Sequence, residues 1–459
     1  MTAQGIPGRS RNRRIGGDPP AWIFAGLLLY TISVYTALGE RIQWLAAIRH
    51  ELLLGTAMAI LCIWVILKLP LPIGAYRSIV VAIVALFISM LTQVPFAADR
   101  QLAWNTFFDR IIKQALFAFF IATLIRSPRY LRFFMAAFLF SLFWVYQEAV
   151  RGLITGALVW YNQGIERLHG AVVLYGHPNG LSLIAVTCLP FVIFLQGQVR
   201  NRLLRIALLA TAGLALLCII YTGSRAGYVG TLAVLSMWWL MSGNKIRGAV
   251  LALLLGVATL VAMPGQYKER FLSIGGEEKE GHSKEARLLL MSDAWQIFLD
   301  NPLGVGLNSF EYVRYVRYGR GQDTHNLYLQ VATHIGVQGL LVFGFFVGSL
   351  LHALQHVNGR LKRLLHRAQG LYQTSAALPG GLAGLRDYLR DVQFTRAVSR
   401  AVLMYMGMLL VNGVFAHSLY LICWWLCSGL AMSMLNITGK LEKECDRRMN
   451  EVGLADRSA

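Results

Sequence analysis

The chain has 459 residues, of which 56% are hydrophobic and 14% charged, and its formal net charge is +20. These proportions exclude an ordinary soluble domain of this length and favour a membrane protein. We expect no nucleic-acid partner despite the charge, because no basic stretch carries the interleaved aromatic side chains of a base-stacking surface.

Long apolar stretches recur along the chain and predict an all-α, polytopic membrane protein with about twelve transmembrane helices. A helix needs about 20 mainly apolar residues to cross the hydrocarbon core, because lipid offers no partner for an open backbone group. The fourth span has Asp109, Arg110 and Lys113 near its start, so we expect it to begin at the membrane surface. The predicted spans are 22–38, 52–68, 78–95, 108–126, 133–149, 177–196, 206–222, 226–242, 248–263, 327–350, 400–416 and 419–436.

The Lys and Arg residues alternate between connections and predict the orientation. They collect in the two tails, 1–21 and 437–459, and in every second connection between the first nine spans, which occupy 22–263. They also collect in the loop 352–399, which follows the first of the last three spans in 327–436. By the positive-inside rule this side is the cytoplasm, so both termini lie there. Most of the +20 charge is then an orientation signal, strengthened by contact with anionic membrane lipids.

The connection 264–326, on the opposite side, is long enough to carry structure or function of its own. Residues 284–299 have apolar side chains at helical spacing and predict an amphipathic helix, which Asp300-Asn301-Pro302 ends. The glycines of Leu303-Gly304-Val305-Gly306 predict a tight turn directly after it. Further on, Arg314 and Arg317 belong to a basic ridge with a spacing of three residues. This ridge either binds substrate or forms a solvated surface neutralised by the acidic residues of the same loop.

Two arginines on this outer side are candidates for binding an anion. Arg225 lies between two apolar spans with almost no loop, where a charge is costly unless it reaches the surface or binds an anion. Arg287 lies on the predicted amphipathic helix, where it is either an interfacial anchor or a functional cation.

A histidine and two amides complete the set of candidates. His325 lies at the start of the tenth span, where a helix N-terminus lowers an imidazole pKa and leaves a base near neutral pH. The alternative is that Asp323-Thr324-His325-Asn326 only caps a helix. Asn179 follows Pro178, whose position at a helix start is structural. Arginines, a base and amides at one membrane face suit a ligand that carries phosphate. The further residues that we expect to contact the diphosphate or the glycan are Asn179, Asn326, Arg314 and Arg317.

At these residues the sequence resembles the O-antigen ligase and polymerase superfamily of bacterial membrane glycosyltransferases. The similarity covers about residues 170–340. One departure is His334, which stands where many members have an acidic residue nine positions after the motif histidine. If that acidic residue assists the base or the acceptor, another carboxylate, such as Asp323 or Glu285, must do so here. The resemblance rests, in chain order, on Gly176-His177-Pro178-Asn179, Thr222-Gly223-Ser224-Arg225-Ala226-Gly227, Arg287, Asn301-Pro302-Leu303-Gly304-Val305-Gly306 and Thr324-His325-Asn326-Leu327-Tyr328-Leu329-Gln330.

The resemblance implies a GT-C-like enzyme of the bacterial inner membrane with its active site facing the periplasm. It implies transfer of a glycan from undecaprenyl diphosphate to an acceptor hydroxyl, without a nucleotide sugar. Arg225 and Arg287 would bind the departing diphosphate, and His325 would deprotonate the hydroxyl or orient the diphosphate. No paired acidic motif marks this face, so we expect no metal and no other cofactor.

Within the superfamily we favour the ligase, whose acceptor is the lipid A core, because the length of the chain suits it. The rival is an O-antigen or exopolysaccharide polymerase, whose acceptor is a second lipid-linked glycan. A transporter or flippase is a second alternative, but transporters place their polar sites near the membrane midplane, often in repeated halves. Here the candidate residues lie at the outer face and no internal repeat is visible.

Overall fold

Apolar helices make up most of the computed structural model, which describes residues 17–162, 164–272, 283–375 and 384–451. Among these residues, eight helices are long and apolar enough to cross a membrane. The prediction of a helical, multi-spanning membrane protein is therefore confirmed. Each of the twelve predicted spans overlaps a helix. The count of twelve stays a prediction, since α1 (Ala21–Thr36) and α11 (Arg225–Met241) have only 16 and 17 residues.

The first third of the chain forms helices that pack around the N-terminal helix α1 and against the C-terminal helices. Asp109 lies in a π-helical segment, Phe107–Ile112, and its carboxylate accepts a hydrogen bond from Lys113 Nζ at 2.7 Å. The fourth predicted span is thus part of a longer continuous helix. The elements are α1, α2 (Leu38–Arg41), α3 (Gln43–Ala47), α4 (His50–Lys68), α5 (Ile73–Thr92), α6 (Arg100–Thr106), the π-helix η1 (Phe107–Ile112), α7 (Lys113–Leu124) and α8 (Pro128–Thr155).

The middle of the chain adds a small antiparallel hairpin to this helical fold. Its strands β1 (Val159–Asn162) and β2 (Ile165–Leu168) pair with Val159 opposite Leu168. Three helices that the sequence places in the outer connection follow the membrane helices. In chain order the elements after the hairpin are the 3-10 turn η2 (Val173–Tyr175), α9 (Pro178–Leu195), α10 (Arg202–Tyr221), α11, α12 (Lys245–Ala262), α13 (Gly265–Leu272), α14 (Ser283–Asp300) and α15 (Phe310–Tyr318).

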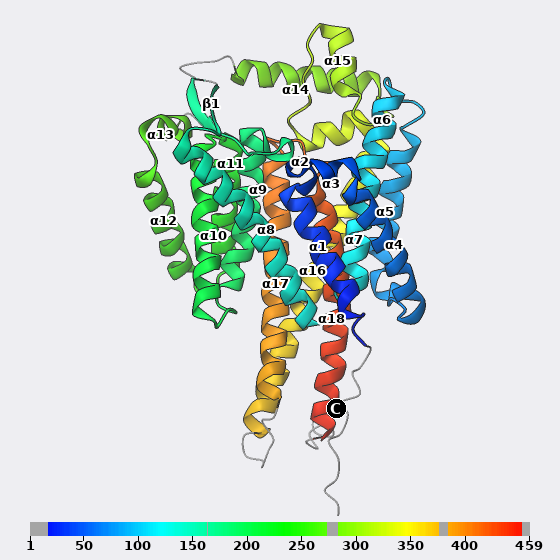
Figure 1. Cartoon of the computed structure of the whole chain (residues 1–459), viewed down its shortest axis with the longest axis vertical. Coiled ribbons are helices and arrows are strands. Elements are labelled where there is room, and N and C mark those ends of the chain that lie inside the picture. Colours follow the sequence, from blue (N-terminus) through cyan, green and yellow to red (C-terminus); the bar gives the residue numbers. More distant parts are fainter. Residues whose placement is uncertain (1–16, 163, 273–282, 376–383, 452–459) are drawn as a thin grey trace, which may run out of the picture.

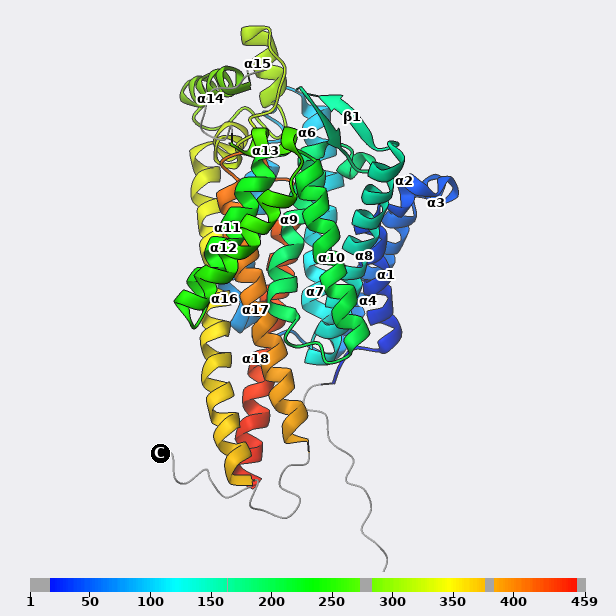
Figure 2. The same cartoon turned by 90° about the vertical axis from the view of Figure 1, so that its left-hand side faces the viewer.

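The last three helices, α16 (Leu327–Ser375), α17 (Leu385–Asn412) and α18 (Ile422–Glu451), form the centre of the bundle. In its most apolar window α18 is 89% buried, because α5, α7, α16 and α17 surround it. The three helices continue beyond the others as a stalk (Figures 1 and 2). The connection predicted at 352–399 is consequently mostly helical, and Arg360 Nε on α16 binds Glu442 on α18 at 2.8 Å.

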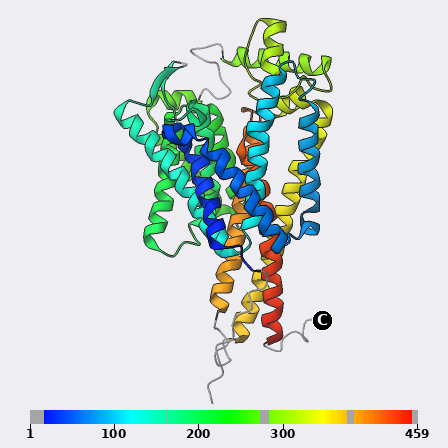
Figure 3. The same ribbon diagram turned by 45° about the vertical axis from the view of Figure 1, so that its right-hand side comes forward.

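The two ends of the bundle differ in what they carry. We call the end with α14 and α15 the outer end, and the end with the stalk the inner end (Figure 1). The chain enters at the inner end, where Tyr130 Oη donates to the carbonyl of Pro19 at 2.9 Å and Ser127 Oγ donates to Asp18 at 2.9 Å. Figure 3 shows the β-hairpin and the α14–α15 pair on opposite sides of the outer end.

Candidate active site

Arg225 begins helix α11 at the outer end, and its neighbours fix it there. Gly223 has φ +56, a backbone conformation that favours glycine, and a Cβ at this position would lie 2.6 Å from Ile165 Cδ1. Ser224 caps α11 by accepting a hydrogen bond from Gly227 N–H at 3.3 Å. Gly227 lies so close to α9 that a Cβ would meet Ser182 Oγ at 1.8 Å. The small residues around Arg225 therefore serve close helix packing.

Arg167 on β2, which the sequence analysis missed, ties three segments together beside Arg225. Its side chain is buried; Nε donates to the carbonyl of Thr222 at 2.8 Å and Nη2 donates to Asn179 Oδ1 at 2.9 Å. Asn179 thus holds Arg167 in place. A neighbouring arginine, Arg270 on α13, donates through Nε to the carbonyl of Gly223 at 2.7 Å.

These arginines lie close enough to change one another's ionisation. The pKa of Arg167 is lowered to about 10, chiefly by burial and then by the positive charge of Arg270, with Arg225 and Arg287 acting in the same direction. Arg167 remains charged at neutral pH, since a pKa of about 10 leaves its guanidinium protonated. We call Arg167, Arg225, Arg270 and Arg287 the arginine cluster.

His325 lies at the edge of this cluster, in the segment before α16. Its φ is +46, which is uncommon for a residue with a side chain. The His325 and His417 ring centres are 5.2 Å apart, and His417 Nδ1 lies 3.8 Å from Asp323 Oδ2. Burial lowers the pKa of His325 to about 4, helped by His417, Arg287 and His177 and opposed by Asp323. The imidazole is therefore neutral at physiological pH.

Arg287 on α14 is exposed, yet its charge lowers the pKa of both Arg167 and His325. Helix α14 lies across the outer end of the bundle (Figure 1). Helix α11, helix α14 and the segment before α16 thus bring together Arg225, Arg287 and His325, which are spread over 100 positions of the sequence. His177 and His417 also act on His325. From the sequence, His177 was named only within the motif Gly176-His177-Pro178-Asn179, and His417 was not named.

Three other residues that we predicted as substrate contacts bind other groups of the protein. Arg314 is buried, and its Nε donates to Asp293 at 3.0 Å, joining α15 to α14. Arg317 pairs with Asp300. Asn326 Nδ2 donates to the carbonyl of Val414 at 3.1 Å, and its Oδ1 accepts from Leu329 N–H at 3.0 Å, as a helix-capping residue does. In the structure these side chains hold the outer segments together, and their contact with substrate stays a prediction.

A break in α16 fixes the outer loop above the site. Gly336 has φ +79 and ψ −167, so the helical hydrogen bond from Val337 N–H to the Thr333 carbonyl is not made. Residues 302–305 of the loop take its place. Val337 N–H donates to the Pro302 carbonyl at 2.9 Å, and Val305 N–H donates to the Thr333 carbonyl at 2.8 Å. Both backbone groups are satisfied, as a membrane-spanning helix requires.

Glycine is needed on both sides of this contact. A Cβ on Gly336 would lie 2.4 Å from the carbonyl carbon of Leu303, and one on Gly304 would lie 2.8 Å from the carbonyl oxygen of His334. The side chain of Gln93, at the end of α5, also donates to the Leu303 carbonyl at 2.8 Å. The predicted glycine turn at 303–306 is therefore a docking segment that positions the C-terminal end of α14.

His334, the departure from the superfamily pattern, lies inside α16 below this contact. Its Nδ1 is 2.7 Å from Tyr420 Oη and 3.3 Å from Asn308 N, which donates to it. Its Nε2 is buried and has no hydrogen-bond partner among the described residues. The position is thus occupied by an imidazole that is hydrogen-bonded to the Tyr420 hydroxyl.

A helical membrane protein with a cationic cluster and a neutral histidine at one end is the class that this fold and site define. Residues 210–344 match the family described as O-antigen ligase, so this part of the chain carries an O-antigen ligase domain and the predicted superfamily is confirmed. No curated protein matches the chain. The matched range includes Arg225, Arg270, Arg287 and His325.

Proposed function

We propose that this protein is an O-antigen ligase, which transfers a glycan from undecaprenyl diphosphate to a sugar hydroxyl of the lipid A core. In this proposal the inner end faces the cytoplasm and the outer end faces the periplasm of a bacterial inner membrane. The observation that carries it is the arginine cluster beside a neutral His325, within or next to the matched family domain.

The arginine cluster suits the leaving group of this reaction. The acceptor oxygen forms a bond to the anomeric carbon of the glycan while the bond from that carbon to the diphosphate breaks, so negative charge grows on the diphosphate. Guanidinium groups bind phosphate oxygens through paired hydrogen bonds. Each well-placed donor contributes about 3 to 4 kcal/mol to stabilising such a charge. The carrier's prenyl chain would remain in the bilayer, beside a cluster at the helix ends.

The neutral His325 suits the other half of the reaction, the loss of the acceptor's proton. A base with a pKa of about 4 is weak, because burial and the positive charges of neighbouring side chains lower the pKa of His325. A bound diphosphate would bring negative charge close to the imidazole and raise its pKa toward neutrality. In our proposal, donor binding therefore converts His325 into an effective base, while Arg167 and Arg270 assist Arg225 and Arg287.

A deletion strain tests the proposal against the polymerase. Loss of a ligase leaves lipid A core without O-antigen while carrier-linked polymer accumulates, whereas loss of a polymerase leaves core with a single repeat. Complementation with the wild-type gene should restore long chains in either case. Unchanged lipopolysaccharide would contradict both activities. Transfer of a purified carrier-linked glycan to lipid A core by the purified protein would then identify donor and acceptor directly.

A further inference from the structure

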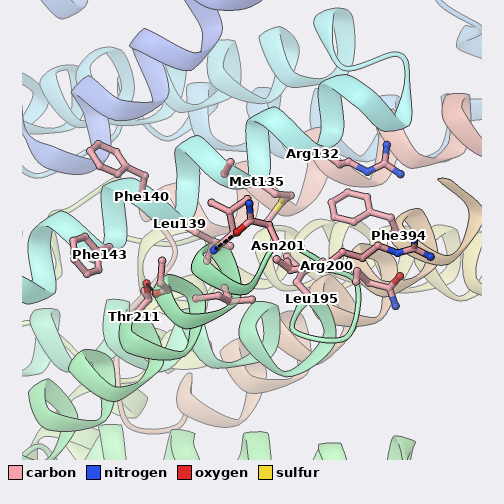
Figure 4. A pocket seen from close by; sticks show the side chains of 16 residues that line it. Arg132, Met135, Leu139, Phe140, Phe143, Leu195, Arg200, Asn201, Thr211 and Phe394 are labelled. Atoms are coloured by element: carbon pink, nitrogen blue, oxygen red, sulfur yellow. Dashed lines mark hydrogen bonds between the residues drawn. The ribbon is translucent and has the colours of Figure 1, made fainter. Parts of the chain in front are cut away.

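A second site lies at the other end of the bundle, far from the arginine cluster. Helices α8 and α10, the α9–α10 connection and one side chain of α17 enclose a crevice of about 640 Å³ (Figure 4). It opens on the membrane-facing side, since Ala136 on α8 and Ala207 on α10 line it and are exposed. The proposed catalytic residues do not line this crevice.

The lining changes in polarity along the crevice. Arg132, Gln198 and Arg200 line it at the inner end, where α8 begins and the α9–α10 connection runs. Leu139, Phe143 and other apolar side chains line it toward the middle of the bundle. Figure 4 shows Arg132 and Phe143 at opposite ends. From residue 132 to residue 143, α8 rises roughly 16 Å, about half the thickness of the hydrocarbon core. This is the polarity of one leaflet of a bilayer.

The charge at the polar end is positive. Arg132 shares its charge with Asp391, whose carboxylate lies 2.5 Å from Nη2, and its guanidinium lies over the ring of Phe394 at 5.1 Å. Arg200 is exposed and forms no ion pair with the described residues. Arg202 and Arg205 follow at the start of α10 and are also exposed. One fixed and one available guanidinium at the membrane surface form a site for an anionic group.

We propose that this crevice binds an anionic phospholipid of the inner-end leaflet, with the phosphate at Arg200 and Arg132 and an acyl chain between α8 and α10. Basic pockets between membrane helices hold such headgroups, and each basic residue near the surface contributes about 1 kcal/mol. The diphosphate carrier is not the occupant, because its proposed site lies at the opposite end of the bundle. The inference does not depend on the proposed glycan transfer.

Lipid retention by the purified full-length protein tests the proposal. Detergent-solubilised protein is incubated with phosphatidylglycerol or with phosphatidylethanolamine of the same acyl chains, and bound lipid is counted by native mass spectrometry. We expect wild-type protein to retain phosphatidylglycerol in preference. Arg200→Gln should weaken this retention about fivefold, the factor that corresponds to one surface charge. Arg200→Lys should preserve it, because the lipid phosphate needs only a positive charge there.

Two further variants separate a site from general attraction to a basic surface. Arg205 lies on α10, five residues after Arg200, but does not line the crevice, so Arg205→Gln should retain phosphatidylglycerol as the wild type does. Ala207→Trp should abolish retention by filling the crevice, and its exposed position leaves the buried core intact. Equal retention of the two lipids by wild-type protein would overturn the proposal. Equal loss from Arg200→Gln and Arg205→Gln, or undiminished retention by Ala207→Trp, would do so as well.

Discussion

The four arginines of the cluster differ in their surroundings, and these differences predict different effects of mutation. Arg167 is buried and hydrogen-bonded to Asn179 and Thr222, whereas Arg287 is exposed on α14. A buried arginine with fixed hydrogen bonds supports the fold of the site, whereas an exposed arginine contributes mainly its charge. We therefore expect charge removal at Arg287 to affect transfer more than stability, and changes at Arg167 to affect both.

Removal of the proposed catalytic side chains should abolish glycan transfer without unfolding the protein. We expect Arg225→Ala, Arg287→Ala and His325→Ala each to lower kcat at least about 100-fold, as loss of one donor to a developing anion does. The assay is transfer of carrier-linked glycan by purified protein. Arg205→Ala is the control, because Arg205 is exposed at the start of α10, at the inner end of the bundle. Wild-type activity in any of the three variants would remove that residue's proposed role.

Arg167→Lys tests whether geometry as well as charge matters in the cluster. Lysine keeps the charge but cannot reproduce the planar fork that reaches both Thr222 and Asn179. We expect about a tenfold loss of kcat/KM together with a lower melting temperature. Asn179→Ala, which removes one of the two acceptors, should give a smaller loss in the same direction. Unaltered kinetics and melting in Arg167→Lys would show that charge alone suffices.

The low pKa of His325 predicts a specific pH dependence. A base must be unprotonated, so activity falls as the pH drops through its pKa. For the free enzyme, reported by kcat/KM, this acid limb should lie near pH 4. For the donor-bound enzyme, reported by kcat, it should lie at higher pH, because the diphosphate stabilises the imidazolium. Coincident limbs in the two profiles would contradict the proposed effect of donor binding on His325.

Part of this site was predictable from the sequence because each residue stood out locally. Arg225 interrupts an apolar stretch, and His325 lies at the start of a predicted span. Arg167, Arg270 and His417 were missed, since their approach depends on the hairpin, on α13 and on the α17–α18 turn. One signal was present: Arg167 and Arg270 are basic residues on the side where the positive-inside pattern expects few.

Among the elements, α16 depends most on a tertiary contact. At the kink, the helical hydrogen bond from residue 337 to residue 333 is replaced by bonds to the outer loop. The sequence predicted a glycine turn at 303–306 but could not identify its partner, because local periodicity does not reveal which distant backbone supplies a hydrogen bond. The region 352–399 was read as a loop from its charges. Its helices form because α16, α17 and α18 bury apolar faces against one another in the stalk.

Substitution of Gly336 should disturb this contact. Gly336→Ala places a Cβ 2.4 Å from the Leu303 carbonyl carbon and strains a backbone with φ +79. We expect a loss of about 1 to 3 kcal/mol in stability and a matching loss of transfer, because the support of α14, and with it Arg287, shifts. Thermal unfolding in detergent and the transfer assay measure the two effects. Gly344→Ala, on the same helix with open space around the added Cβ, should leave both unchanged.

At the scale of the whole molecule, the orientation of the bundle is testable by labelling. Lys268 on α13 is exposed at the outer end, and Lys362 on α16 is exposed in the stalk, while all six native cysteines are buried. Lys268→Cys in intact cells should react with a maleimide that enters the periplasm but cannot cross the inner membrane, and Lys362→Cys should react only after that membrane is permeabilised. The reverse pattern would place the arginine cluster in the cytoplasm and contradict the proposed function.

Hydropathy was sufficient to predict a helical, multi-spanning membrane protein, since a spanning segment must satisfy its backbone groups within lipid. The number of spans and the orientation stay predictions. The packing of α18 at the centre and the length of the stalk were not predictable, because they depend on which helical faces meet.

The contact between the outer loop and α16 also bears on how the protein is made. Residues 302–305 leave the ribosome before residues 333–337, and in the proposed orientation they must cross the membrane to reach the periplasmic side. Until they dock, the Val337 N–H and the Thr333 carbonyl have no partner in their final geometry. Membrane insertion alone therefore cannot complete the fold of α16. We expect its outer segment to reach its native form only after translocation of the loop, so the active site assembles late in biosynthesis.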